Sequence, residues 1–406
     1  MDSVFSQHSK CHARVPASYF LRLIVPKFHI TKKLRTSAHS TTFSFGPPTT
    51  QMSARTVPEY SMDNIPISGL QELETHLQQL LGDPSLPFNV KLLDDVELQL
   101  TEILKSTTQD PTPLLSLTIK LLSPLSFTRT LTIADPPSLL TALSSPLPGA
   151  NLLALAIIQK AAKSPSDASI LSTLPEIVEM LVKSWLASTD VGVGERAARV
   201  LGDLLETDCE AVDNNTRIAD SRAQINGDEI IKRRVPGHGR LWRLILLSRP
   251  NLTLIQQLCS PNSAYLGQPR TTHQVTISQG RLLRLLPRLC TLNIGALSHP
   301  VFQDLFALPE EISSRVGGGL LQWAALGMVD KSDTLMHLSL VDFFETFVSV
   351  MRVSRRSAEM DAFIRKLMAT ALECDSELEA ALKTLPDRTI EDEAEPLRAY
   401  ITGLLN

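Results

Sequence analysis

Few histidine, cysteine and glycine residues in this sequence have a spacing that could support catalysis or metal binding. His8 and His12 stand four residues apart beside Cys11, but the surrounding segment has no helical or strand pattern, and chance spacing is the simpler interpretation. Gly192 and Gly194 form a GxG that lacks the third glycine of a dinucleotide-binding loop and follows a helical pattern instead of a strand. We therefore interpret this GxG as a turn between helices.

The common catalytic signatures are also absent from the sequence. It contains no GKS or GKT, no HExxH, no GxSxG and no CxxC pair. The five cysteines are widely spaced, which favours buried thiols in an intracellular protein over disulfides or a zinc site. The three glycines 317–319 predict a helix start, and His238 between two glycines is interpreted as a spacer. We expect no enzymatic activity, no catalytic residue, no metal and no cofactor.

Arginines at helical spacing form a more informative pattern. Arg281, Arg284 and Arg288 lie three and then four residues apart, so they share one face of a helix whose other faces carry leucine. Such a face is either solvated or pairs with acidic side chains of a partner, because a guanidinium can bind a carboxylate through two parallel hydrogen bonds. Arg196 and Arg199 have a three-residue spacing on an earlier helix. All five arginines are candidate protein-binding residues.

The stretch 333–352 predicts a helix that is apolar over at least half of its circumference and carries Phe343, Phe344 and Phe347. So broad an apolar face requires burial by more than one neighbouring helix. The opposite side is polar, and we expect it to face a partner across an inner surface of the protein. The candidate protein-binding residues on this side are Ser339, Asp342, Glu345 and Arg352.

These arginine and polar faces exist only if the residues form helices, and the pattern of the sequence is predominantly helical. Leucine dominates the apolar residues and aromatic residues make up only 5%, which favours helices over strands. Prolines and Ser/Asp clusters separate the helical stretches, whereas the β-favouring pieces 131–133 and 275–277 are too short to build a sheet. Pro287 predicts a kink. The predicted helices are 67–81, 88–107, 111–122, 136–145, 150–163, 168–187, 193–206, 239–246, 250–258, 276–290, 299–307, 318–329, 333–352, 357–373, 376–384 and 390–404.

The predicted helices recur in pairs about every 35–45 residues, close to the period of HEAT and armadillo repeats. A single pair cannot bury its apolar face, so neighbouring pairs must stack. We therefore predict an all-α, HEAT/armadillo-like helical-repeat solenoid, with a compact helical bundle as the alternative. Repeats are expected over 62–206 and 239–406. The polar segment 207–238 between them is predicted to be a mobile loop insertion, disordered alone or ordered by a partner.

Residues 1–61 form a basic N-terminal extension. Residues 1–51 contain seven Lys or Arg and one Asp, a composition typical of a mitochondrial transit peptide. However, Pro16 and Pro26 leave room for barely two helical turns. We therefore interpret the extension as disordered or as a spurious gene-model extension, with Met52 or Met62 as the start, and treat mitochondrial targeting as the alternative.

The rest of the chain is acidic. Because the whole chain has a net charge of −4 and residues 1–51 carry +6, the remainder carries −10. Tracking a phosphate backbone requires a basic surface, so no direct nucleic-acid partner is expected. No apolar run approaches the roughly 18 residues of a membrane span, and no membrane partner is expected either.

Several packing motifs, taken in order, resemble those of a known family. They are residues 237–243 (GHGRLWR), 258–260 (LCS), 278–289 (SQGRLLRLLPRL), 319–330 (GLLQWAALGMVD) and 333–344 (DTLMHLSLVDFF). In this order they resemble the fungal DNA mismatch repair proteins of the high-spontaneous-mutation type. That family is similar to the 26S proteasome assembly chaperone known in animals as non-ATPase regulatory subunit five. The resemblance covers about residues 62–406.

The resemblance implies a HEAT/armadillo solenoid that acts as a non-enzymatic chaperone for assembly of the 19S regulatory particle base of the proteasome. Such a chaperone binds the C-terminal domain of one base ATPase subunit, as a monomer with its client, in the cytoplasm or nucleus. It delays docking on the 20S core and then leaves. The alternative is a stable HEAT-type adaptor or scaffold, for example in DNA mismatch repair or transport. No binding residue follows from the resemblance, so the nine candidates rest on helix faces alone.

Overall fold

The computed structural model describes residues 112–405 except 124, 211–235, 262–263, 266–267, 355–356 and 374, together with isolated positions between 68 and 91. Three sequence predictions therefore lie outside the described residues, wholly or for the most part. They are the extension 1–61, the helices 67–81 and 88–107, and the greater part of the insertion 207–238.

The chain forms two compact units. The larger unit holds residues 142–406 with 126–131, and the other holds the chain up to 125 with 132–141. Helix α4 (Thr112–Leu122) lies in the smaller unit, while α5 (Phe127–Ile133) and α6 (Pro136–Leu143) contain the residues at which the chain passes from one unit to the other. α5 includes a piece that the sequence marked as β-favouring, so local β preference is overridden there.

The described residues of the larger unit form helices apart from a short hairpin of β1 (Ala264–Tyr265) and β2 (Gln268–Pro269), and this confirms the predicted all-α class. Several of its helices begin with proline, whose missing N–H costs nothing in the first helical turn. Its helices are α7 (Pro148–Gln159), η3 (Lys160–Lys163), α8 (Pro165–Ser172), α9 (Pro175–Ala187), α10 (Val191–Thr207), α12 (Arg240–Leu246), α13 (Arg249–Cys259), α14 (Thr272–Ser298), α15 (Glu310–Val316), α16 (Leu320–Leu326), α17 (Thr334–Val353), α18 (Ala358–Leu372), α19 (Ser376–Thr384), η4 (Leu385–Arg388) and α20 (Glu391–Leu405).

Several predicted helices differ from the structure, and α5 and α15 were not predicted. The prediction 168–187 is wrong as one helix, because Pro175 starts α9 and ends α8 before it. α14 is longer than predicted because Thr271 and Gln274 form a capping box at its start. Its non-helical residue is Asn293 (φ −158°, ψ 78°), six residues beyond Pro287, where the kink was predicted. The predicted helix 299–307 is wrong, since these residues form bends and turns and the next helix is α15.

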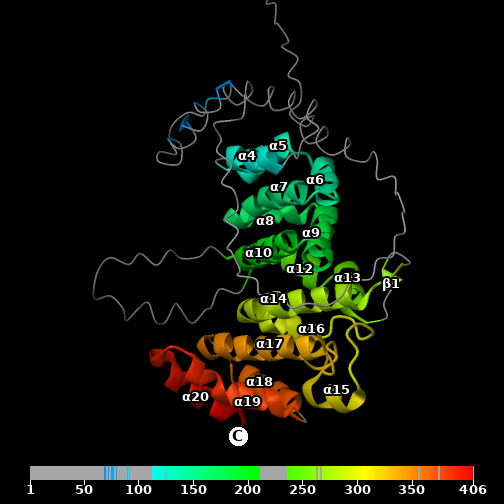
Figure 1. Cartoon of the computed structure of the whole chain (residues 1–406), viewed down its shortest axis with the longest axis vertical. Helices are drawn as coiled ribbons and strands as arrows, with labels where there is room; N and C mark the ends of the chain where they lie inside the picture. The colour runs from blue at the N-terminus through cyan, green and yellow to red at the C-terminus, as the bar shows by residue number, and fades with distance from the viewer. Residues whose placement is uncertain are drawn as a thin grey trace, which may run out of the picture. The chain divides into compact units, whose positions relative to one another are not determined.

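Successive helices of the larger unit pack in layers (Figure 1). α9 packs on α10, α10 on α14, and α14 on α17, which in turn contacts α19 and α20. The α17 phenylalanines fill the centre of the last layers: the Phe343 ring lies edge-on to Phe344 at 5.0 Å and stacks with Phe347 at 5.7 Å between centroids. All three are buried, as the broad apolar face of the sequence predicted.

α17 is also the one helix in the described part of the chain that is long and apolar enough to cross a membrane. This length of apolar helix does not appear as an apolar run in the sequence, because polar residues interrupt it. Within the fold, α14, α19 and α20 contact α17, and its aromatic side chains are buried. The most apolar window of α17 is 39% buried, so the helix packs into the fold with part of its surface.

The residues that flank the segment 211–235 are held together. The Asp208 carboxylate is buried and accepts hydrogen bonds from the backbone N–H groups of Leu241 (2.6 Å) and Trp242 (3.3 Å), so it caps the start of α12. Gly239 donates its N–H to the Asp208 carbonyl at 2.8 Å, and Gly237 donates to Cys209 at 2.9 Å.

The glycines around His238 are required by this close approach and are more than the spacer that the sequence suggested. A Cβ on Gly237 would lie 2.1 Å from the carbonyl carbon of Asp208, and Gly239 has a left-handed φ of 62°. The backbone of 208–210 and 236–239 thus closes the base of the predicted insertion before α12 begins.

Replacing Asp208 by alanine should lower the free energy of unfolding by about 1–3 kcal/mol, because two buried N–H groups lose their acceptor. Glu210→Ala is the matched control: it removes only an exposed ion pair with Arg243, for which about 0–1 kcal/mol is expected. Urea denaturation followed by circular dichroism measures both. Equal losses for the two variants would contradict the capping role of Asp208.

Candidate protein-binding groove

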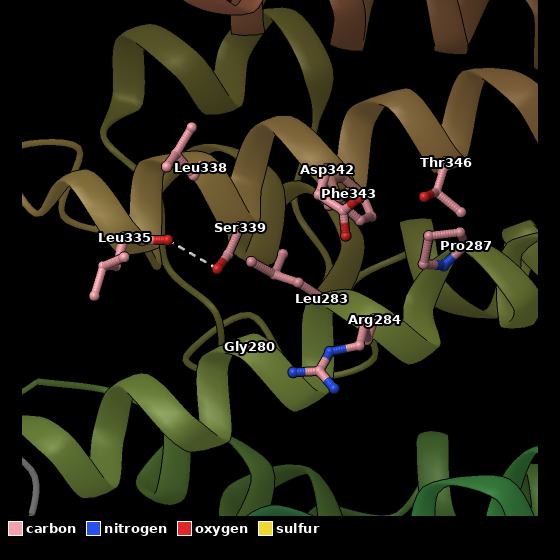
Figure 2. Close-up of a pocket in the computed structure, with 10 residues that line it drawn as sticks. All are labelled: Gly280, Leu283, Arg284, Pro287, Leu335, Leu338, Ser339, Asp342, Phe343 and Thr346. Carbon is pink, nitrogen blue, oxygen red and sulfur yellow. Dashed lines mark hydrogen bonds between the residues drawn. The ribbon is translucent and has the colours of Figure 1, made fainter. Parts of the chain in front are cut away.

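A groove of about 450 Å³ runs between α14 and α17 in the larger unit (Figure 2). Its α14 wall consists of Gly280, Leu283, Arg284 and Pro287. Its α17 wall consists of Leu335, Leu338, Ser339, Asp342, Phe343 and Thr346. The groove thus combines residues of both helix faces that the sequence singled out.

The apolar part of the groove has a buried floor and an exposed end. Leu283 and Phe343 are each 1% exposed and form the floor. Leu335 and Leu338, one turn apart near the start of α17, are 76% and 56% exposed. Large side chains left this open on adjacent turns beside a groove are typical of an interaction surface.

The polar part of the groove lies along α17. Figure 2 shows Ser339 and Asp342 pointing toward α14. The Ser339 hydroxyl donates to the Leu335 carbonyl at 2.9 Å, so its proton is used within the helix. Asp342 is exposed and has neither an ion pair nor a hydrogen bond among the described residues. On the opposite wall, Arg284 pairs with Glu195 of α10 at 2.5 Å.

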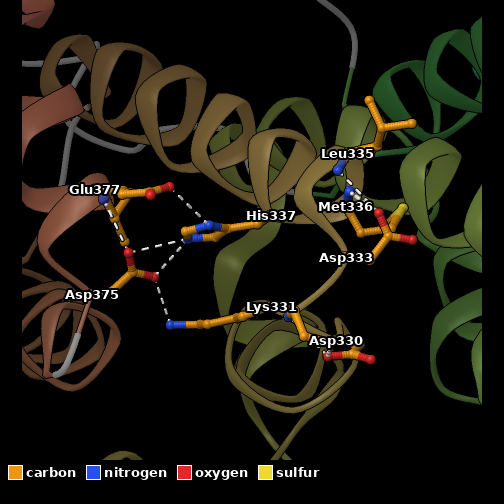
Figure 3. A network of polar contacts seen from close by, with 10 residues as sticks. Asp330, Lys331, Asp333, Leu335, Met336, His337, Asp375 and Glu377 are labelled. Atoms are coloured by element: carbon orange, nitrogen blue, oxygen red, sulfur yellow. Dashed lines mark hydrogen bonds and ion pairs between the residues drawn. The ribbon is translucent and has the colours of Figure 1, made fainter.

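The start of α17, which carries the exposed leucines, is fixed by a polar network (Figure 3). Asp333 caps the helix by accepting from the N–H groups of Leu335 (3.0 Å) and Met336 (3.2 Å). Two further residues near this end, Lys331 (2.7 Å) and His337 (3.1 Å), contact the carboxylate of Asp375. Residue 375 is the N-cap of α19, so the network ties α17 to the helix that follows α18.

Asp375 is buried yet charged. Burial by itself raises its pKa, but hydrogen bonds from Lys331, from the N–H of Leu378 and from His337 outweigh it and hold the pKa below the usual aspartate value. A carboxylate with a lowered pKa stabilises the fold above its unfolded-state pKa, and this stabilisation is lost as the pH falls through the lower folded-state pKa.

The predicted basic strip on α14 faces the protein's own chain, which corrects the expectation that it is available to a partner. Arg281 is only 5% exposed, and its guanidinium donates to the carbonyls of Leu186 (3.3 Å), Ser188 (2.7 Å) and Asp190 (3.3 Å) between α9 and α10. Burial lowers the pKa of Arg281. Arg281 therefore holds α14 to the backbone that connects α9 to α10.

Arg288 is likewise paired within the chain. It contacts Asp203 (2.8 Å) and Glu206 (2.5 Å) of α10. Two α10 glycines make room for this packing, since a Cβ on Gly194 would lie 2.2 Å from the Arg281 guanidinium carbon and a Cβ on Gly202 would lie 2.4 Å from an Arg288 nitrogen. The GxG interpreted as a turn is in fact the first turns of α10.

The remaining predicted residues are dispersed. Arg196 donates to Gln159 of α7, whereas Arg199 is exposed and has no ion pair in the part of the chain that the structure describes. Glu345 pairs with Arg388 of η4 at 2.5 Å, and Arg352 pairs with Glu393 of α20. The polar side of α17 is therefore divided: Ser339 and Asp342 face the groove, while Glu345 and Arg352 hold the C-terminal helices.

Three of the candidate protein-binding residues, Arg284, Ser339 and Asp342, line the groove, whereas none of its apolar residues was a candidate. Leu335 and Leu338 fall outside the main apolar face of α17, and leucines on the polar side of a helix are the signal that could have identified them. Gly280 gave no such signal. A Cβ added there would meet no atom within 4 Å, so Gly280 leaves one end of the groove open.

Metal and thiol chemistry find no support in the described residues. Within them, no group of three or more His, Cys, Asp or Glu could hold a metal ion. Cys259 and Cys290 are buried, and burial raises the pKa of both thiols, which keeps them protonated and unreactive.

Comparison with protein-family models and curated sequences identifies no relative of the chain. No protein-family model matches the chain, and no curated protein has a matching sequence. The fold and groove define an all-helical protein with a candidate protein-binding surface.

Arg281→Ala should lower the free energy of unfolding by about 1–3 kcal/mol, because the Ser188 carbonyl loses its guanidinium donor. Arg284→Ala on the same helix is the control, and its exposed ion pair should contribute less than about 1 kcal/mol. Thermal and urea unfolding of both variants test this difference. A stable Arg281→Ala protein would mean that the guanidinium is not needed between α9 and α14.

The Asp375 network should make the fold sensitive to acid. Wild type should lose stability as the pH falls below about 4, the ordinary aspartate range, whereas Asp375→Asn should be less stable at pH 7 and lose less on acidification. Urea midpoints at pH 7 and pH 3 provide the measurement. Parallel pH profiles for the two proteins would rule out Asp375 as a source of this sensitivity.

Proposed function

We propose that this chain is a HEAT/armadillo-like solenoid that acts as a chaperone in assembly of the 19S proteasome base. In this proposal it binds the C-terminal domain of one base ATPase subunit without catalysing a reaction, as a monomer with its client, in the cytoplasm or nucleus. The motif order between 237 and 344 supports this function, because it resembles that chaperone family. The layered helices of the larger unit are compatible with stacked repeats.

The groove between α14 and α17 is the observation that carries the proposal of a client-binding surface. It places two exposed leucines beside an aspartate that has no partner among the described residues. The two helices that form it are fixed by contacts on their other sides. Arg281 holds α14 to the backbone between α9 and α10, Arg288 holds it to α10, and the Asp375 network fixes the start of α17. A client can therefore bind without reorganising the helices, which reduces the entropic cost of association.

The test is affinity capture with purified ATPase subunits of the base and with assembled 20S particles. The full chain should retain one ATPase subunit through its C-terminal domain and should not retain mature 20S particles. Leu335→Ser with Leu338→Ser should reduce capture at least about tenfold, since each substitution removes apolar surface that binding would bury.

Val353→Ser is the matched control, because Val353 is 67% exposed on the same helix but lies outside the groove. Its capture should equal that of wild type. Failure to retain any base ATPase subunit would refute the chaperone proposal and favour the adaptor alternative. Retention that the leucine substitutions leave unchanged would move the client site elsewhere.

A further inference from the structure

We infer that the groove between α14 and α17 binds an amphipathic helix of the client that carries a lysine or arginine opposite Asp342. The inference rests on the proposed function and deepens it by specifying the chemistry of the bound segment. Three observations lead to it: the charge balance of the groove, the exposed leucines, and the spacing of the lining residues.

The charged residues that line the groove favour a partner that carries a cation. The groove's only basic residue, Arg284, is already paired with Glu195. The next acid along α17, Glu345, is paired with Arg388. Asp342 has no partner among the described residues, so the groove carries one unbalanced negative charge. Covering an unpaired carboxylate costs free energy, and a binding segment avoids this cost by supplying a cation.

The exposed leucines favour a bound segment that has apolar side chains beside that cation. Leu338 and Asp342 stand four residues apart, so they lie one helical turn apart on the same side of α17. Leu335 extends the apolar surface by one more turn, and Leu283 with Pro287 provides the facing wall. The complementary segment therefore has apolar side chains within one turn of a Lys or Arg.

The lining residues follow the spacing of helix-to-helix recognition. On α17, positions 335, 338, 339, 342 and 346 form one stripe along about 16 Å of helix. A partner helix of that length and about 10 Å diameter occupies roughly 1,200 Å³, well above the groove's 450 Å³. The groove thus takes the side chains of one helix face while the partner's backbone remains at the rim, as in other helix-in-groove complexes.

Fluorescence anisotropy with the full chain and two labelled 18-residue peptides tests the inference. Both peptides carry leucine at i, i+3, i+4 and i+7, and one has lysine where the other has glutamate, one turn from the leucines. The lysine peptide should bind saturably and at least about fivefold more tightly than the glutamate peptide. Asp342→Asn should remove most of this preference, as expected for loss of an ion pair worth about 1 kcal/mol.

Gly280→Leu tests the site without removing any contact. It places a side chain in the open end of the groove, where a Cβ meets no atom within 4 Å, and leucine is a better helix former than glycine. Peptide affinity should fall at least about tenfold while the thermal midpoint stays equal or rises. If Gly280→Leu does not fold, Leu338→Ser provides the same readout from an exposed position, and Val353→Ser remains the control.

Equal binding of the two peptides, or affinity unaffected by both Leu338→Ser and Asp342→Asn, would overturn the inference. So would self-association that depends on protein concentration and disappears in Leu338→Ser, because the occupant would then be a second copy of the chain. Capture of a base ATPase without a preference for the lysine peptide would refute this inference alone. Lysine-peptide binding without ATPase capture would refute the proposed function and leave the groove's chemistry intact.

Discussion

The buried guanidinium of Arg281 is the contact on which the arrangement of the later helices depends. A cation inside a protein is tolerated only when acceptors surround it, and the backbone between α9 and α10 provides three carbonyl oxygens that accept from Arg281. The contact therefore gives the buried guanidinium the hydrogen-bond acceptors that it needs. It positions α14 on α9 and α10, and α17 then packs on the opposite side of α14.

This arrangement gives α14 two different sides. Arg281 and Arg288 lie against the α10 glycines in a close polar contact, while Leu283 and Pro287 line the groove toward the phenylalanine helix α17. The polar side is rigid because each guanidinium has fixed acceptors. The other side leaves a groove, because Gly280 contributes no side chain and Leu335 and Leu338 point away from the buried phenylalanines. The candidate site thus lies on the side of α14 that faces α17, away from the contacts of Arg281 and Arg288.

The helical class and most helix positions could be predicted because leucine periodicity and proline breaks are local signals. The side-chain partners could not be predicted, because they come from residues distant in the sequence. The spacing of Arg281, Arg284 and Arg288 correctly predicts one shared face, but no local pattern shows that Asp203 and Glu206 of α10 both pair with Arg288. The same limit applies to the glycines at 194 and 237, whose neighbours come from α14 and from residue 208. Of the groove, only its polar residues stood out, since an exposed leucine and a core leucine are identical in sequence.

The closed base before α12 has a consequence for the length of the predicted insertion. Because Gly237 and Cys209 are joined by a backbone hydrogen bond of 2.9 Å, the path between them begins and ends at nearly the same point. Adding residues to such a path costs little, since the closure entropy grows only with the logarithm of its length. A change in the number of residues between positions 209 and 237 can therefore leave these joined ends, and with them α10 and α12, in place.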